Sequence, residues 1–194
     1  MALPNRSPIS VEEYLQLDRD SVETRYEYID GHIRMLAGGT VNHAKISLNI
    51  ARILYDLLRN GSCNVLNSDV RVRLSETRYV YPDVTVSCDG RDQGSADIIL
   101  FPRLVVEILS PSTEDYDRGR KFTYYRACPT IQEYVLISST YRAIEVFRRE
   151  RNTLWTLQVF GPDDIVELTS LGIHFSVSAI YENVELPEDD NQPA

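Results

Sequence analysis

The sequence lacks any long apolar segment. No run of apolar residues approaches the roughly 18 that a membrane-spanning helix requires. The first ten residues, MALPNRSPIS, contain no apolar stretch of the kind found in a secretory signal peptide. These two absences predict a protein that makes no membrane contact and resides in the cytoplasm.

Cysteine is also scarce, with three residues that lie far apart in the chain: Cys63, Cys88 and Cys128. An odd and unclustered set argues against a disulfide framework and against a zinc knuckle. A reducing compartment is the simplest interpretation, and it agrees with a cytoplasmic location.

Several motifs that identify common enzyme classes are missing. The chain contains no P-loop, no G-x-G-x-x-G, no G-x-S-x-G and no H-E-x-x-H, and it has no internal repeat. Its 194 residues, 43% of them hydrophobic, fit one domain that can bury a proper core. We expect this domain to span residues 1–186 and to be followed by a disordered acidic tail over residues 187–194.

Positive charge is in deficit. The formal net charge is -9 and the isoelectric point is about 4.8. Nucleic acid repels an acidic protein at long range, which argues against a general nucleic-acid coating role. A small basic patch remains open, and so does an active site that binds a metal and needs negative charge for it.

Local signals place the first elements of structure. Ser10 and Glu13 form a capping box that starts a helix. Asp30–Gly31, between two β-rich runs, predicts a two-residue hairpin turn. Apolar residues that recur with a period of 3.6 predict a long helix over residues 41–59.

The remainder of the chain is mainly strands. We expect strands over residues 63–74 (as one or two), 81–88, 103–110, 133–138, 143–149 and 154–160, a helix over 113–127 and a short helix over 176–183. The sum is a mixed α/β domain. Its central sheet is flanked by the 41–59 and 113–127 helices.

Two of the expected strands each carry one acid. Asp83 in YPDVTVS and Glu107 in LVVEIL can meet at one spot if their strands are neighbours. Asp83 by itself is explained most simply by an arginine partner or a loop cap. Glu107 lies among valine, isoleucine and leucine, where an unpaired carboxylate is costly, so it must be paired, protonated or bound to a metal. Two carboxylates in one place suit Mg²⁺ or Mn²⁺.

The helix expected over residues 113–127 contains the most basic stretch of the chain, DRGRK. Asp117, Lys121 and Tyr125 are spaced by four residues and share one helix face. The simplest interpretation is a solvated helix with intrahelical ion pairs. The functional alternative is a cation placed directly after a metal-binding strand.

These segments resemble a known family. YPD, VEILSPST and DRGRKFTYY follow in order as in the PD-(D/E)XK nuclease superfamily and, more narrowly, as in the bacterial restriction-endonuclease family called Uma-two. That family also has a Y-E-x-I-D-G hairpin, matched by YEYIDGHI, and a histidine at the start of its first long helix, matched by His43. The resemblance covers about residues 10 to 140. Each motif alone is weak, whereas five in order with matching spacing are fairly specific.

The resemblance implies a restriction-endonuclease-like α/β core, with a mixed central β-sheet flanked by helices and an N-terminal β-hairpin. It implies that Asp83 and Glu107, with the backbone carbonyl of Ile108, hold Mg²⁺ or Mn²⁺ for the hydrolysis of phosphodiester bonds. Leu109 stands where the superfamily has its lysine, two residues after the glutamate. Lys121, on the next helix, matches the lysine of the narrower family.

The resemblance also assigns weaker roles. Glu27 matches the acid of the family hairpin, and it is either an exposed strand acid or part of the metal site. His43 is either structural or reaches phosphate or water. Four further residues are candidates for substrate binding: Arg118, Arg120, Tyr125 and Arg126.

We therefore expect a metal-dependent endonuclease that binds nucleic acid, most simply DNA, weakly and in a strongly salt-dependent way. Cleavage of a duplex needs two sites, which predicts a homodimer. Two alternatives stay open. The displaced lysine and the acidic isoelectric point favour a catalytically inactive nuclease-fold binding protein, and the charge also permits an enzyme that acts on a small phosphorylated substrate.

Overall fold

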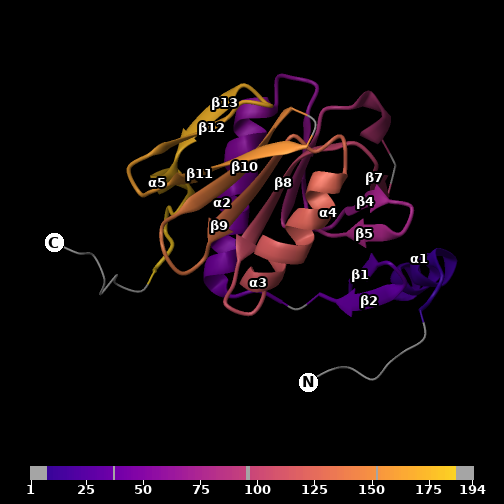
Figure 1. The fold of residues 1–194 in the computed structure, drawn as a ribbon. Coiled ribbons are helices and arrows are strands. Elements are labelled where there is room, and N and C mark those ends of the chain that lie inside the picture. The colour runs from indigo at the N-terminus through magenta and orange to yellow at the C-terminus, as the bar shows by residue number, and fades with distance from the viewer. Residues whose placement is uncertain (1–7, 37, 95–96, 152, 187–194) are drawn as a thin grey trace.

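The computed structural model describes residues 8–36, 38–94, 97–151 and 153–186 and has the expected mixed α/β architecture (Figure 1). The tail expected over residues 187–194 lies outside the described residues. The helical segments are α1 (Val11–Asp20), α2 (Val41–Leu58), η1 (Gly90–Asp92), α3 (Glu114–Tyr116), η2 (Asp117–Lys121), α4 (Phe122–Ala127) and α5 (Val177–Ile180). The strands are β1 (Tyr26–Ile29), β2 (His32–Met35), β3 (Asn64–Asn67), β4 (Arg71–Ser75), β5 (Arg78–Val80), β6 (Val84–Ser87), β7 (Ile98–Ile99), β8 (Pro102–Leu109), β9 (Glu133–Ser138), β10 (Ile144–Arg151), β11 (Leu154–Phe160), β12 (Ile165–Leu168) and β13 (Ile173–Ser176).

The N-terminal elements form as the local signals predicted. The hydroxyl of Ser10 accepts a hydrogen bond from the Glu13 amide and the Glu13 carboxylate accepts one from the Ser10 amide, which closes the capping box of α1. Strands β1 and β2 pair as an antiparallel hairpin. Its turn residues Asp30 and Gly31 have φ angles of 49° and 92°, which is the left-handed backbone that a two-residue hairpin of this kind requires.

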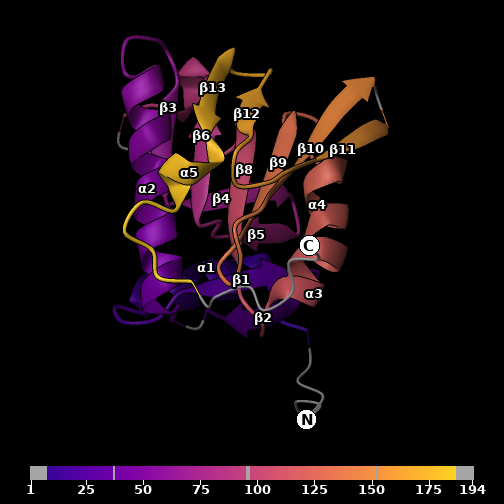
Figure 2. The same ribbon diagram turned by 90° about the vertical axis from the view of Figure 1, so that its left-hand side faces the viewer.

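A six-stranded sheet with the order β11-β10-β9-β8-β6-β3 forms the centre of the structure. Strand β8 pairs antiparallel with β6 and parallel with β9, so the sheet is mixed. Helices α2 and α4 lie on opposite faces of this sheet (Figure 2). The expected sandwich of a central sheet between two helices is confirmed.

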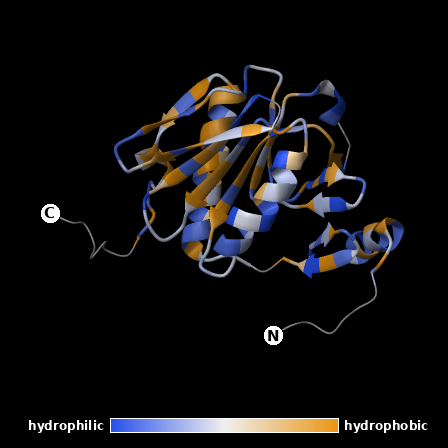
Figure 3. Ribbon diagram, in the orientation of Figure 1, coloured by the Kyte–Doolittle hydropathy of each residue, from blue (hydrophilic) through white to orange (hydrophobic). Residues whose placement is uncertain are grey.

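Burial on both faces explains the composition of the central strands. Seven of the eight residues of β8 are buried, and all six of β9 are. Apolar residues accordingly concentrate in these strands (Figure 3). Alternate residues of β8 contribute to different cores, with Val106 facing α2 and Val105 facing α4. Glu107 therefore points to the α4 face.

The segment over residues 63–74, expected as one or two strands, forms two strands that belong to different sheets. Strand β3 joins the central sheet, whereas β4 joins a second, five-stranded sheet with the order β2-β1-β5-β4-β7. Four strands were not expected, namely β5, β7, β12 and β13. They are only two to four residues long, so their pairing depends on neighbours that are distant in sequence.

The helix expected over residues 113–127 forms, but it is not uniform. Its middle, η2, is a π-helical turn between α3 and α4. Asp117, Lys121 and Tyr125 share one face, as their spacing predicted, and that face is buried. The interpretation of this segment as a solvated helix is therefore wrong for Lys121, which is only 6% exposed. A π-helical turn at such a place is typical of functional sites.

The structure corrects the inference, drawn from the number and spacing of the cysteines, that the chain has no disulfide framework. Cys63 and Cys88 form a disulfide, and Cys128 is a buried free thiol. Strands β3 and β6 are antiparallel neighbours in which Asn64 lies opposite Ser87, so the next residue outward on each strand meets its counterpart. The sequence separation of 25 between the two cysteines hid this relation in the sequence. The inference of a reducing compartment thereby loses its basis.

The helices bear on the prediction, made from the lack of long apolar runs, that the chain has no membrane-spanning segment. In the part of the chain that the structure describes, no helix has the length and apolar character needed to cross a membrane.

Candidate metal-dependent active site

The two strand acids lie beside each other. In the antiparallel pair of β6 and β8, Val84 is opposite Val106, so Asp83 and Glu107 occupy the next position and project from the same face. Asp83 is the residue before β6 rather than part of it. Its Oδ2 atom accepts a hydrogen bond of 2.7 Å from the amide of Ile108. Sheet register thus fixes the relative position of the two carboxylates.

Glu107 is buried in this site with strong hydrogen-bond donors. Its Oε1 atom accepts hydrogen bonds from Lys121 Nζ at 2.8 Å and from the Tyr125 hydroxyl at 2.5 Å. Burial raises the pKa of Glu107 from 4.5 to about 8, and Lys121 opposes this rise while nearby acids add to it. The site therefore resists full ionisation unless further positive charge arrives.

Lys121 contacts three carboxyl groups. Its Nζ atom lies 2.8 Å from Glu107 Oε1, 3.1 Å from Glu27 Oε1 and 3.7 Å from Asp117 Oδ1. Burial alone favours the neutral amine, but these carboxylates outweigh it and raise the pKa of Lys121 well above its usual range. A simple pair between Asp117 and Lys121 does not describe the arrangement, because that contact is the longest of the three.

Glu27 belongs to the same cluster. It lies on β1, is fully buried, and contacts Lys121 and, at 3.4 Å, the amide of Tyr81 through Oε1. Its Oε2 atom is buried and has no hydrogen-bond partner. The interpretation of Glu27 as an exposed strand acid is wrong. A buried carboxylate oxygen without a partner is costly and points to a missing donor or cation.

His43 reaches the site from the first turn of α2. Thr40 caps this helix by accepting a hydrogen bond from the His43 amide, which fixes the first turn. The Nε2 atom of His43 lies 3.3 Å from Asp83 Oδ2. The hydrogen bond to Asp83 raises the pKa of His43. His43 and the Ile108 amide therefore hold the same carboxylate oxygen of Asp83 in place.

The candidate substrate-binding residues differ in what they can reach. Arg118 is held by Glu114 at 2.7 Å and by Glu145 at 2.5 Å, so its charge is already matched. Arg120 and Arg126 are exposed. Tyr125 is fully buried, and its hydroxyl serves Glu107 instead of facing a substrate. The arrangement leaves Arg120 and Arg126 as the accessible cations of the segment.

The donor set fits a divalent cation. Among the residues that the structure describes, Asp83 Oδ1 and Glu107 Oε2 accept no hydrogen bond, although the other oxygen of each carboxylate does. No group of three or more His, Cys, Asp or Glu in those residues is arranged to hold a metal ion. A cation at this site would be bound by the Asp83 and Glu107 carboxylates, by a backbone carbonyl, and by oxygens of water or substrate. Mg²⁺ commonly uses such a set, because it keeps several waters.

Two contributors were not identified from the sequence. Asp117 is buried in the cluster rather than on a solvated face, and burial raises its pKa. The hydroxyl of Tyr134, on β9, donates to the Asp117 carbonyl at 3.2 Å and so ties the π-helical turn to the sheet. The D-x-x-x-K spacing was the available signal for Asp117, whereas nothing in the sequence marks Tyr134.

Comparisons with known proteins agree with this geometry. Residues 11–178 match the Uma2 family, described as "Putative restriction endonuclease". The solved structure of a putative nuclease belonging to DUF820 from Anabaena variabilis shares the fold, with a TM-score of 0.75 and 22% identity over 90% of this chain and 98% of that one. The fold and the match together define a nuclease-type class of α/β protein. The chain belongs to the Uma2 family of putative restriction endonucleases.

Two curated relatives come from Synechocystis sp. The uncharacterized protein slr1290 is 41% identical over 177 residues, which cover 91% of this chain and 93% of that protein. The uncharacterized protein sll1609 is 29% identical over 177 residues, which cover 89% of this chain and 99% of that protein. The similarity therefore extends over nearly the whole length of each protein.

Proposed function

We propose that this protein is a metal-dependent endonuclease with a restriction-endonuclease-like core, built as one domain over residues 1–186. The observation that carries the proposal is the meeting of Asp83, Glu107 and Lys121 in one site. Three carboxyl groups contact the single lysine there and Asp83 adds a fourth acid beside Glu107, so the site is short of positive charge. Membership of the Uma2 family supports a nuclease reaction.

The proposed cofactor is Mg²⁺ or Mn²⁺. Asp83 and Glu107 would hold it through their oxygens that are free of hydrogen bonds, with the backbone carbonyl of Ile108 as a third ligand. Bound there, the cation supplies Lewis acidity toward the scissile phosphate and lowers the pKa of a coordinated water. The carboxylates hold a hard cation because their oxygens are the ligands it prefers.

The roles of the remaining site residues follow from their contacts. Lys121 stabilises charge that builds on the phosphate oxygens or orients the attacking water. Glu27 and Asp117 keep the ammonium group charged and in place. His43 and the Ile108 amide orient Asp83, while Tyr125 orients Glu107. Each orienting group is a positioning residue and does not contact the substrate.

The proposed substrate is nucleic acid, most simply DNA. Arg120 and Arg126 are exposed on the segment that carries Lys121 and can contact phosphates, which gives affinity without sequence choice. The net charge of -9 weakens binding at long range, and the affinity should fall steeply with salt.

A homodimer through β11 would supply two sites for a duplex. This strand, LWTLQVF, forms the edge of the six-stranded sheet, carries no charge and exposes Leu154, Leu157 and Val159. Natural edge strands are usually protected by charges or proline, so a long uncharged edge suits pairing with a second copy about a two-fold axis.

Light scattering at micromolar concentration tests this assembly. Twice the chain mass of 22.2 kDa is expected for the wild type, and one chain mass for Leu157→Lys. Leu48→Lys, at a similarly exposed position on α2, should remain dimeric. A wild-type protein that is monomeric rules the dimer out.

A plasmid-nicking assay with Mn²⁺ tests the activity. The wild type should nick, Asp83→Asn should not, and Asp56→Asn, an exposed acid on α2, should behave as the wild type. Thermal melting with Mn²⁺ should raise the midpoint for the wild type and not for Asp83→Asn. Absence of both nicking and Mn²⁺ stabilisation in the wild type would instead support an inactive nuclease-fold binding protein.

A further inference from the structure

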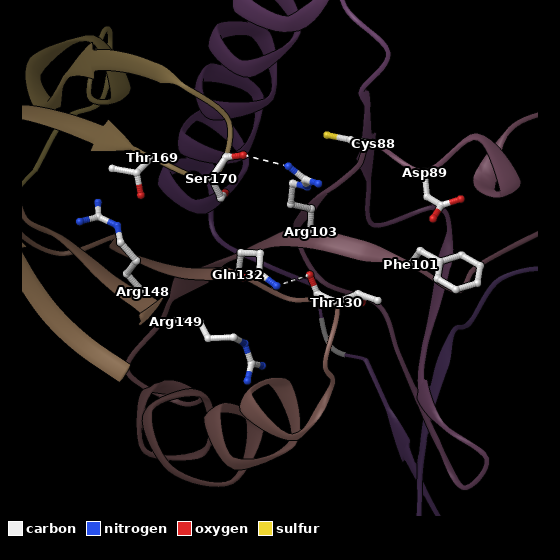
Figure 4. Close-up of a pocket in the computed structure, with 10 residues that line it drawn as sticks. All are labelled: Cys88, Asp89, Phe101, Arg103, Thr130, Gln132, Arg148, Arg149, Thr169 and Ser170. Carbon is white, nitrogen blue, oxygen red and sulfur yellow. Dashed lines mark hydrogen bonds between the residues drawn. The ribbon is translucent and has the colours of Figure 1, made fainter. Parts of the chain in front are cut away.

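A second polar site lies away from the carboxylate cluster. A pocket of about 510 Å³ opens near the start of β8, where Arg103 stands four positions before Glu107 (Figure 4). Arg103, Arg148 and Arg149 line it, together with Thr130, Thr169 and Ser170. Three arginines therefore line one pocket of a chain whose net charge is -9.

The wall of this pocket is held rigidly by a buried carboxylate. Glu133, at the start of β9, is fully buried and accepts hydrogen bonds from the amides of Thr169 at 3.1 Å and Ser170 at 3.1 Å. It also accepts hydrogen bonds from Arg148 Nε at 2.9 Å and from the Ser170 hydroxyl at 2.5 Å. The turn between β12 and β13 is thereby fixed against β9. The pocket is formed before any ligand arrives.

Arg149 is fixed as well. It donates to the carbonyls of Ile131, Arg126 and Cys128 at 2.8 to 2.9 Å. Its guanidinium carbon also lies 4.5 Å from the centre of the Trp155 ring. These contacts fix the position of the Arg149 side chain in the wall of the pocket.

Arg103 differs from the other two arginines because it is exposed and donates one hydrogen bond, to the Ser170 carbonyl at 3.1 Å. Within the described ranges it forms no ion pair with a carboxylate. The acids around the pocket are Asp89, which is bound by Arg91, and Glu133, which is bound by Arg148. Arg91 and Arg148 thus match these two acids, and among the described residues the charge of Arg103 is left without a carboxylate partner.

We propose that this pocket binds a phosphate group, either from a free nucleotide or phosphate ion or from a nucleic acid. Guanidinium groups match the geometry of phosphate oxygens and are weakly hydrated, so they release water readily. Arg103 offers such a group, Arg148 keeps its Nη1 beside its bonds to Glu133 and the Glu167 carbonyl, and Thr130 adds a hydroxyl. A tetrahedral anion can accept from several directions at once, which suits donors that come from different walls. This site is separate from the proposed cleavage site and does not depend on it.

Titration of the protein with inorganic phosphate, at constant ionic strength and followed by amide NMR, tests the proposal. We expect a saturable shift of the Thr169 and Ser170 amides. Arg103→Ala should weaken this binding by about tenfold or more, because a charge-assisted contact of this kind contributes at least ~1.4 kcal/mol. Arg52→Ala, which removes the same charge from the exposed face of α2, should bind as the wild type. A linear, unsaturated shift, or equal affinity for Arg103→Ala, would overturn the proposal.

Two oligonucleotides, one with and one without a 5′-phosphate, distinguish a terminal phosphate from a backbone phosphate as the bound group. They are measured in the presence of EDTA, so that cleavage plays no part. A requirement for the 5′-phosphate supports a terminal monoester. Equal binding of both, weakened alike by Arg103→Ala, supports backbone diesters. Insensitivity of both to Arg103→Ala refutes the site, whatever the result of the nicking assay.

Discussion

The ammonium group of Lys121 lies 2.8 Å from Glu107 Oε1, although fourteen residues separate the two along the chain. The superfamily pattern has its lysine on the glutamate strand itself, but Leu109 occupies that position and is buried in the core. The π-helical turn Asp117–Lys121 delivers the ammonium from the following helix instead. A cation therefore lies beside Glu107 even though the usual lysine is absent.

Lys121→Met should abolish nicking and lower the free energy of unfolding at neutral pH by about 3–5 kcal/mol. The physical reason is that removing one partner leaves buried carboxylates without compensation. Urea unfolding measures the stability and the plasmid assay the activity. Lys45→Met is the matched control, since Lys45 is the other lysine of the chain and its ammonium group donates to the Asn183 carbonyl. A loss of only a few tenths of a kcal/mol would mean a surface-type ion pair.

Stability of the metal-free protein should fall as the pH rises from about 4.5 to about 8, through the contribution of Glu107. The folded pKa of Glu107 is raised to about 8 by burial, so its protonated form stabilises the fold. That contribution is complete below the unfolded value of 4.5 and is lost as the pH passes the folded value. Its size is on the order of 5 kcal/mol.

Urea unfolding in EDTA across this range, for the wild type and Glu107→Gln, measures the effect. The variant should lose this part of the pH dependence, and saturating Mn²⁺ should remove it from the wild type. A wild-type profile that matches Glu107→Gln would show that Glu107 does not titrate with a raised pKa.

Tyr125→Phe should weaken Mn²⁺ binding with little change in fold. The Tyr125 hydroxyl donates to Glu107 Oε1, and without it the carboxylate can turn its other oxygen toward Lys121. We expect a destabilisation of about 1–2 kcal/mol and an increase in the Mn²⁺ dissociation constant, measured by calorimetry. Tyr124→Phe is the control, because Tyr124 stacks with Arg78 through its ring. An unchanged Mn²⁺ affinity in Tyr125→Phe would show that the Tyr125 hydroxyl does not position Glu107 for metal binding.

The disulfide between Cys63 and Cys88 gives a direct count of thiols. Alkylation of the denatured protein followed by mass spectrometry should label one cysteine without reductant and three after reduction. The Cys63→Ser, Cys88→Ser double variant should lose about 3 kcal/mol of stability, since the closed loop spans 25 residues. Cys128→Ser should keep the disulfide. Three labelled thiols in non-reduced protein purified under air would disprove the bond.

The sequence by itself determined the elements whose signals act over a few residues. The capping box of α1, the Asp30–Gly31 turn and the apolar period of α2 depend on backbone chemistry within one or two turns, and all three formed as predicted. The two strand acids were also recognisable, because a carboxylate in an apolar strand is conspicuous.

Tertiary structure alone decided how these groups meet. The register of β6 against β8 set Asp83 beside Glu107, and the π-helical turn set Lys121 above them. The same is true of Glu133, whose partners lie on a turn far along the chain, and of the Cys63–Cys88 pair. Such contacts join residues that are distant in sequence, so their free energy depends on the assembled sheet and leaves no local pattern from which to predict them.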